Sequence, residues 1–106
     1  MDELVKIVVF VPENDAASIR QALGENGTGV IGEYTFCSYS LKGVGRYLAS
    51  DKAKPYIGSK GKIEKVDEQR IEVQCDRLRA KEVVAIIRKA HPYEEVVIDV
   101  YPLISL

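Results

Sequence analysis

Hydrophobic and polar residues follow one another along this chain in blocks that predict a short series of strands and helices. Residues 4–11 form an almost unbroken apolar run that is rich in β-branched side chains, and Pro12 follows it. Such a run is typical of a central strand that is buried on both faces of a sheet. We therefore expect a core strand that ends at the proline.

The next block has the spacing of an amphipathic helix. Asn14 or Asp15 stands where an N-terminal cap is needed, and Gly27 offers the left-handed conformation that commonly ends a helix. The apolar positions that recur at helical intervals are Ala16, Ile19 and Leu23. The pattern predicts one helix directly after the first strand.

The middle of the chain contains strand patterns separated by a polar segment. Residues 34–48 are rich in aromatic and β-branched side chains, and Gly43 and Gly45 predict a turn that divides them into two strands. Residues 51–62 carry proline and glycine among polar residues, which indicates a long loop of the kind that serves function or assembly. Residues 70–75 alternate between apolar and polar side chains and predict a further strand.

A second helix and a last strand are predicted in the final third. Asp76 can cap the helix, whose apolar face consists of Ala80, Val83, Val84 and Ile87. The helix must stop at His91, because a residue before proline is driven out of the α-helical conformation. Residues 96–101 then alternate as a strand, which Pro102 closes.

These elements predict the fold class. With residues 34–48 counted as one strand unit, the order is strand, helix, two strands, helix, strand. This is the order of the ferredoxin-like βαββαβ sandwich, an α+β fold in which two helices cover one face of an antiparallel sheet. A chain of 106 residues is about the size of one domain, so we expect residues 1–106 to form a single domain.

Composition and charge exclude several classes of function. The 15 basic and 16 acidic side chains nearly cancel, so the chain lacks the basic surface of a nucleic-acid-binding or membrane-surface protein. No apolar run approaches the roughly 20 residues that span a bilayer, and the start of the chain lacks the pattern of a signal peptide. We expect a cytoplasmic protein with small, near-neutral partners, whose Cys37 and Cys75 are reduced thiols used in packing.

Residues 27–32 match the letters of the dinucleotide-binding motif GxGxxG. That motif requires a strand before the glycines and a helix after them, so that the N-terminus of the helix meets the pyrophosphate. Here the predicted helix precedes the glycines and a strand follows. We interpret these glycines as a helix stop and a tight turn that needs positive φ.

Candidate chemistry centres on the only histidine of the chain, within the sequence HPYEE at residues 91–95. Cys37 with His91 is the one possible nucleophile and base pair, although no third orienting group is visible. His91, Glu94 and Glu95 offer a partial metal site, but adjacent carboxylates in a strand point to opposite faces, so a full site would be shared between subunits. The alternative is structural: the histidine ends a helix and the glutamates are a solvated strand entrance.

Five segments in the same order resemble the inserted domain of the NIF-three-like family, the dinuclear metal centre proteins, and its free-standing YqfO-type relatives. They are VVFVPE at 8–13, GTGVIGEYTFCSYS at 27–40, GVGRYL at 43–48, PYIGSKGKIEKVDEQRIEV at 55–73 and AHPYEEVVIDVYPL at 90–103. The resemblance implies a fold similar to the CutA and PII proteins, which are ferredoxin-like and trimeric. The segments that supply the family's metal ligands are absent from this chain.

The first functional hypothesis is therefore a non-enzymatic, homo-oligomeric binding or regulatory module, trimeric as the resemblance implies, with clefts between subunits for a small ligand or a divalent metal ion. The polar groups expected to bind a ligand are Tyr34, Cys37, His91 and Tyr93, with Glu94 beside the same cleft. One alternative is a small hydrolase-like enzyme that uses Cys37 or His91. Another is a purely structural oligomerisation domain.

Overall fold

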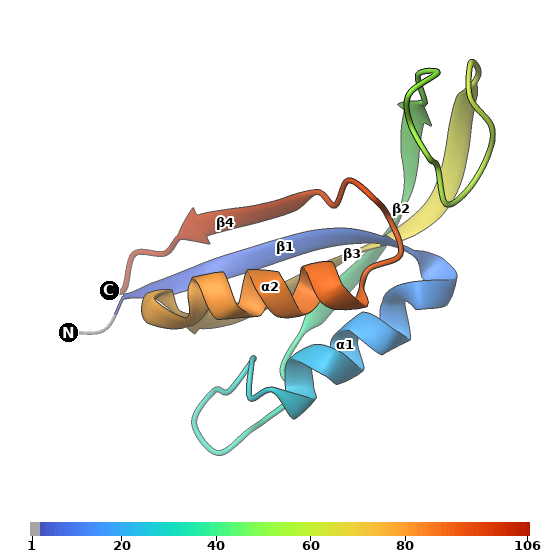
Figure 1. The fold of residues 1–106 in the computed structure, drawn as a ribbon. Helices are drawn as coiled ribbons and strands as arrows, with labels where there is room; N and C mark the ends of the chain where they lie inside the picture. Colours follow the sequence, from blue (N-terminus) through green and yellow to red (C-terminus); the bar gives the residue numbers. More distant parts are fainter. Residues whose placement is uncertain (1–2) are drawn as a thin grey trace.

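The computed structural model describes residues 3–106 and has the predicted ferredoxin-like α+β fold. A four-stranded antiparallel sheet has the strand order β2-β3-β1-β4, and both helices lie on one of its faces (Figure 1). The strands are β1 (Leu4–Pro12), β2 (Tyr39–Leu48), β3 (Ile63–Asp76) and β4 (Ile98–Pro102), and the helices are α1 (Ala16–Glu25) and α2 (Ala80–Ala90). We call the two faces of the sheet the helix-covered face and the helix-free face.

Strand β1 is the centre of the sheet, as its apolar run predicts. It pairs with β3 along its whole length and with β4 from Val5 to Val9. Ile7 and Val9 belong to the core cluster on the helix-covered face, and Val8 is fully buried on the other face. A strand that is buried on both faces must be apolar at nearly every position, which explains the run.

The helix-free face is covered partly by its own charged side chains. Glu72 accepts from Lys6 at 3.2 Å and from Arg70 at 2.9 Å, and the Arg70 guanidinium lies 5.6 Å from the centre of the Phe10 ring. The hydrogen bonds from Arg70 and Lys6 lower the pKa of Glu72. Val8, whose pairing partner on β3 is Glu72, is fully buried on this face although no helix covers it.

The end of α1 confirms the interpretation of the glycine-rich segment. The amide of Gly27 donates to the Gly24 carbonyl and that of Thr28 to the Leu23 carbonyl, both at 3.0 Å, which is the Schellman arrangement. Gly27 has φ +75°. A helix precedes these glycines and a loop follows, so the segment is not a dinucleotide-binding motif. The predicted side-chain cap at Asn14 or Asp15 is not formed, and a short 3-10 helix, Glu13–Asp15, leads into α1 instead.

The prediction of a glycine turn within residues 34–48 is wrong. Gly43 and Gly45 lie inside the continuous strand β2, and residues 26–38 form a loop in which Ile31 and Tyr34 make a β-bridge. A Cβ atom at Gly45 would overlap the carboxylate of Glu68 from the neighbouring strand. Gly45 thus lies in close contact with the Glu68 carboxylate and does not form a turn.

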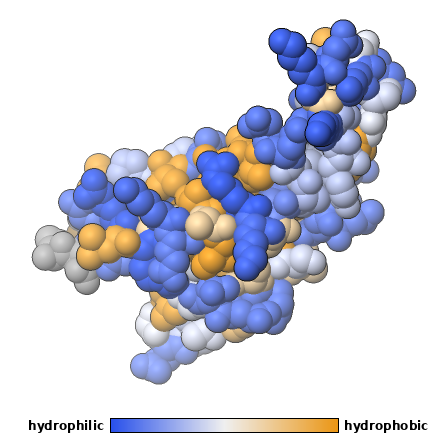
Figure 2. Space-filling model, viewed as in Figure 1, coloured by the Kyte–Doolittle hydropathy of each residue, from blue (hydrophilic) through white to orange (hydrophobic). Residues whose placement is uncertain are grey.

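Strands β2 and β3 form a long hairpin that projects beyond the body of the molecule (Figure 1). Strand β3 begins at Ile63, well before the predicted residues 70–75, and residues 49–62 form the expected long loop. The projecting end is mostly hydrophilic in Figure 2, and this is why apolar alternation did not indicate the outer part of the strand.

Helix α2 ends as predicted, and its start differs slightly. The Asp76 side chain accepts the amide of Leu78 at 3.0 Å and caps the 3-10 helix Arg77–Arg79, which precedes α2. At the other end His91 has extended φ and ψ of −84° and 138°, as expected before proline. In the described residues no helix has the length and apolar character needed to cross a membrane.

The packing of β1 predicts a large loss of stability when its core side chains are shortened. Ile7 is 0% exposed, so Ile7→Ala should lower the free energy of unfolding by about 2–5 kcal/mol, as measured by urea denaturation. Leu78→Ala is the matched control, because that side chain is 89% exposed and should cost less than about 0.5 kcal/mol. Equal losses in the two variants would contradict this description of the core.

Candidate functional site

The segment between α2 and β4 is attached to the core strand through His91. The side chain is 7% exposed, and its Nε2 atom lies 2.7 Å from the Phe10 carbonyl oxygen. The amide of Tyr93 donates to Nδ1 at 3.1 Å. Because Nδ1 accepts a hydrogen bond from the Tyr93 amide, it carries no hydrogen, and we assign the imidazole hydrogen to Nε2, which donates to the Phe10 carbonyl oxygen.

The position of this contact explains why a histidine is placed there. Pairing between β1 and β4 ends at Val9 and Ile98, one residue before Phe10. The Phe10 carbonyl group accepts its hydrogen bond from the imidazole, and a buried carbonyl without any partner would be unfavourable. His91 thus continues the attachment of this segment to β1 where the strand pairing stops.

Tyr93 follows the histidine and turns toward the hairpin. Its hydroxyl donates to Glu68 Oε2 at 3.0 Å. Its ring centre lies 6.3 Å from that of Tyr47 and 6.2 Å from that of Tyr56, with interplanar angles of 68° and 62°. Burial and the hydrogen bond to Glu68 raise the pKa of Tyr93 far above its usual value, so this phenol stays protonated.

These side chains border a pocket of about 410 Å³ at the base of the hairpin. Its walls come from β1, β2, β3, the β2–β3 loop and the α2–β4 segment, so parts of the chain that are distant in sequence meet there. Most of the lining is apolar or aromatic, with three carboxylates and one guanidinium. The residues that line it are Phe10, Gly45, Arg46, Tyr47, Leu48, Ala49, Ala53, Pro55, Tyr56, Glu68, Tyr93, Glu94, Glu95 and Val97.

Glu94 and Glu95 do not lie in a strand, so the prediction made for adjacent strand carboxylates does not apply to them. Glu94 and Glu95 both line the pocket, because β4 begins only at Ile98 and the residues before it form a bend. Glu94 Oε1 accepts the amide of Lys54 at 2.6 Å, which joins the α2–β4 segment to the β2–β3 loop.

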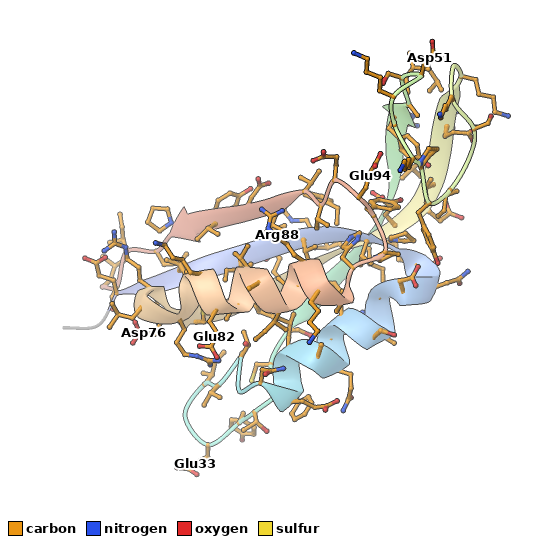
Figure 3. The ribbon with its side chains drawn as sticks, viewed as in Figure 1. Glu33, Asp51, Asp76, Glu82, Arg88 and Glu94 are labelled. Atoms are coloured by element: carbon orange, nitrogen blue, oxygen red, sulfur yellow. The ribbon has the colours of Figure 1, made fainter. Side chains whose placement is uncertain are left out.

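Tyr34 and Cys37 lie elsewhere in the chain. They belong to the α1–β2 loop, whose Glu33 lies well away from Glu94 in Figure 3. Tyr34 is 75% exposed, and the Cys37 thiol lies 3.8 Å from the Thr35 carbonyl oxygen. Of the predicted ligand-binding residues, the structure brings His91 and Tyr93 together, with Glu94 and Glu95 beside them, and leaves Tyr34 and Cys37 apart.

The His91 imidazole is not hydrogen-bonded to a nucleophile, as a catalytic base would be, and both of its ring nitrogens already have hydrogen-bond partners. His91 contacts Phe10 and Tyr93, whereas Cys37 contacts Thr35. Binding of a metal ion by His91 would require loss of one of the two imidazole hydrogen bonds. Within residues 3–106, no three His, Cys, Asp or Glu side chains of one chain gather as a metal-binding group.

Sequence reasoning did not identify Tyr47, Tyr56 and Glu68 as part of this site. The one available signal was Gly45 within an otherwise strand-like pattern, because glycine inside a strand often marks a close approach by another group. Glu68 is that group. Its pairing position opposite Gly43 comes from the register of β2 and β3, which the sequence pattern does not specify.

Comparisons with known proteins agree with the resemblance described above. The "GTP cyclohydrolase 1 type 2 homolog" of Mycobacterium tuberculosis is 44% identical over 102 residues, which are 96% of this chain and 27% of that protein. The crystal structure of a Bacillus cereus protein related to NIF3 matches 96% of this chain and 26% of its own, with 40% identity and a TM-score of 0.83. No family model matches the chain.

The CutA1 structure from Ehrlichia chaffeensis is similar in fold alone, with 18% identity and a TM-score of 0.74, and the match covers 100% of this chain and 86% of that one. The resemblance to NIF-three-like proteins and the CutA-like fold are thus confirmed. The chain spans about a quarter of the length of the curated relatives that it matches.

The contacts of His91 predict a structural role that can be measured. His91→Ala leaves the Phe10 carbonyl and the Tyr93 amide without their partner, so the free energy of unfolding should fall by at least about 2 kcal/mol. Glu95→Ala, in the same segment but exposed, should change it by less than about 0.5 kcal/mol. Urea denaturation of both variants gives the comparison, and an unchanged His91→Ala would contradict the assigned contacts.

The raised pKa of Tyr93 predicts how stability changes at alkaline pH. Above about pH 10 the tyrosine ionises in the unfolded chain but not in the folded one, so the free energy of unfolding should fall as pH rises. Tyr93→Phe cannot ionise and should show a shallower fall between pH 9 and 11 than the wild type, whereas lysines contribute to both proteins. Parallel curves in the two proteins would rule out the buried, hydrogen-bonded state of Tyr93.

Proposed function

We propose that this relative of the NIF3-related proteins is a single-domain, non-enzymatic, homo-oligomeric module that binds a small ligand in the pocket at the base of its hairpin. The observation that carries the proposal is the construction of that pocket. Tyr93 and Glu94 of the α2–β4 segment are held before any ligand arrives, by hydrogen bonds to Glu68 of β3 and to the Lys54 amide of the β2–β3 loop. A site held in this way loses little freedom on binding.

The chemistry of the polar groups favours binding over catalysis. Both ring nitrogens of His91 form hydrogen bonds with backbone groups, and the Tyr93 hydroxyl donates a hydrogen bond to Glu68. Nucleophilic catalysis needs a base within hydrogen-bond reach of the nucleophile, and Cys37 has its contact with the Thr35 carbonyl instead. We therefore assign these groups to positioning and recognition.

Self-association is supported by the helix-free face. Tyr39, Leu41 and Tyr101 lie on it and are 66%, 44% and 42% exposed. Strand β2 is also an edge strand of ten residues, and its outer edge offers unpaired backbone groups. Long, exposed edges with apolar side chains are usually covered in native proteins, and a second copy of the chain would cover this one.

The trimer implied by the likeness to CutA and PII proteins accounts for the predicted residues that the single chain leaves apart. Neighbours in a cyclic trimer meet through different surfaces. Tyr34 and Cys37 of one copy can thus complete the cleft that contains Tyr93 and Glu94 of the next. A divalent metal ion at such a cleft would take Glu94 and Glu95 from one copy and its remaining ligands from another.

The oligomeric state is tested by light scattering coupled to size-exclusion chromatography. The wild type should have three times the chain mass of 11.8 kDa, and Leu41→Lys should be a monomer because it places a charge in the proposed interface. Leu78→Lys, an 89% exposed leucine outside the sheet, should remain trimeric. A monomeric wild type would overturn the homo-oligomer, and a trimeric Leu41→Lys would exclude this face as the interface.

A further inference from the structure

We propose that the pocket at the base of the hairpin is an aromatic cage for an organic cation that carries a quaternary or substituted ammonium group. This inference rests on the proposed binding function and names the class of ligand. It follows from three properties of the pocket: the arrangement of its tyrosine rings, the sign of its charged groups and the absence of a metal-binding set of side chains.

The tyrosine rings meet edge to face rather than in parallel stacks. Tyr93 meets Tyr47 at 68° and Tyr56 at 62°, so its ring faces in a different direction from the other two, and all three rings line the same pocket. The ring of Phe10 adds a further wall. A cation within about 6 Å of such ring faces is attracted by their π-electrons, and several rings around one site are typical of ammonium recognition.

Two of the rings are held in place by the hydrogen bonds of their own hydroxyl groups. The Tyr47 hydroxyl donates to the Ile57 carbonyl oxygen, and the Tyr93 hydroxyl donates to Glu68. The aromatic surfaces are therefore fixed before a ligand binds. Because the hydroxyls already have partners, the rings offer their π-faces more than their polar ends.

The charged groups favour a cation. Three carboxylates, those of Glu68, Glu94 and Glu95, line the pocket with one guanidinium, that of Arg46. Tyr93 remains a neutral donor to Glu68 because its pKa is raised, so the phenol adds no charge of its own to the pocket. A neutral ligand would remove water from these carboxylates without replacing the lost interactions, whereas an ammonium group would compensate for them.

Within one chain, the pocket fits an organic cation better than a metal ion. Calcium takes about 6–8 oxygen ligands and magnesium demands octahedral geometry, and the described residues of one chain contain no group of three candidate ligands. The pocket volume of about 410 Å³ lies in the range of about 300–1,000 Å³ that is usual for small-molecule sites. Apolar walls with a few carboxylates suit the methyl groups and the charge of a substituted ammonium ion.

The inference is tested with two probes of the same shape that differ in charge. Choline and its neutral isostere 3,3-dimethyl-1-butanol are titrated separately into the ¹⁵N-labelled full chain and followed by NMR. Choline should shift the amide signals of Tyr47, Tyr56 and Tyr93 and bind about tenfold more tightly than the alcohol. Equal affinities for choline and the alcohol would overturn the proposal that the ligand is a cation, but they would support the proposal of a ligand-binding pocket. If neither probe shifted these signals, both proposals would be overturned.

Variants of Tyr56 and Glu94 test the contributions of the aromatic ring and of the carboxylate separately. Tyr56 is 55% exposed, so Tyr56→Leu should leave the fold intact and weaken choline binding about tenfold, whereas Tyr56→Phe should retain it. Glu94→Gln should weaken choline more than the alcohol, and Glu25→Gln on the exposed surface of α1 should affect neither. Choline binding that is unchanged in both Tyr56→Leu and Glu94→Gln would overturn the assignment to this pocket. The oligomeric state is measured separately. A monomeric protein that binds choline would overturn the proposed trimer and would support the proposed class of ligand.

Discussion

Strand β1 is the element on which the rest of the structure depends. It is apolar on both faces, pairs with β3 and β4 on its two sides, and packs against both helices. The hydrophobic effect strongly favours its burial at the centre, because an apolar strand at an edge would expose one side to water. The position of β1 in turn determines where β2 joins the sheet through β3 and where the segment after α2 must pass.

The candidate site is an extension of that central strand. Where the pairing of β4 ends, the imidazole of His91 accepts from Tyr93 and donates to Phe10, so the backbone of β1 holds the α2–β4 segment against the sheet. Tyr93 is thereby directed toward Glu68, and Glu94 toward the β2–β3 loop. A structural histidine can in this way shape a pocket whose lining it does not join.

Local patterns in the sequence predicted some elements of the fold correctly and misled at particular residues. The buried strand, both helices and the stop at His91 follow from local rules of periodicity and backbone conformation, which act over a few neighbouring residues. Gly43 and Gly45 were misinterpreted as a turn because the reason for Gly45 is the Glu68 carboxylate, which is contributed by another strand. Glu94 and Glu95 were assigned to opposite faces because the bend before β4 leaves no mark in the apolar pattern.

The sequence by itself determined the core strand, the two helices and the fold class, because these depend on local periodicity and on the need to bury apolar surface. Only the tertiary structure decided which polar residues meet. It joined Tyr47, Tyr56 and Glu68 to the predicted Tyr93, Glu94 and Glu95, and it left Tyr34 and Cys37 in the α1–β2 loop, outside the lining of that pocket. The physical reason is that strand register and the path of the long loop are set by contacts between distant segments.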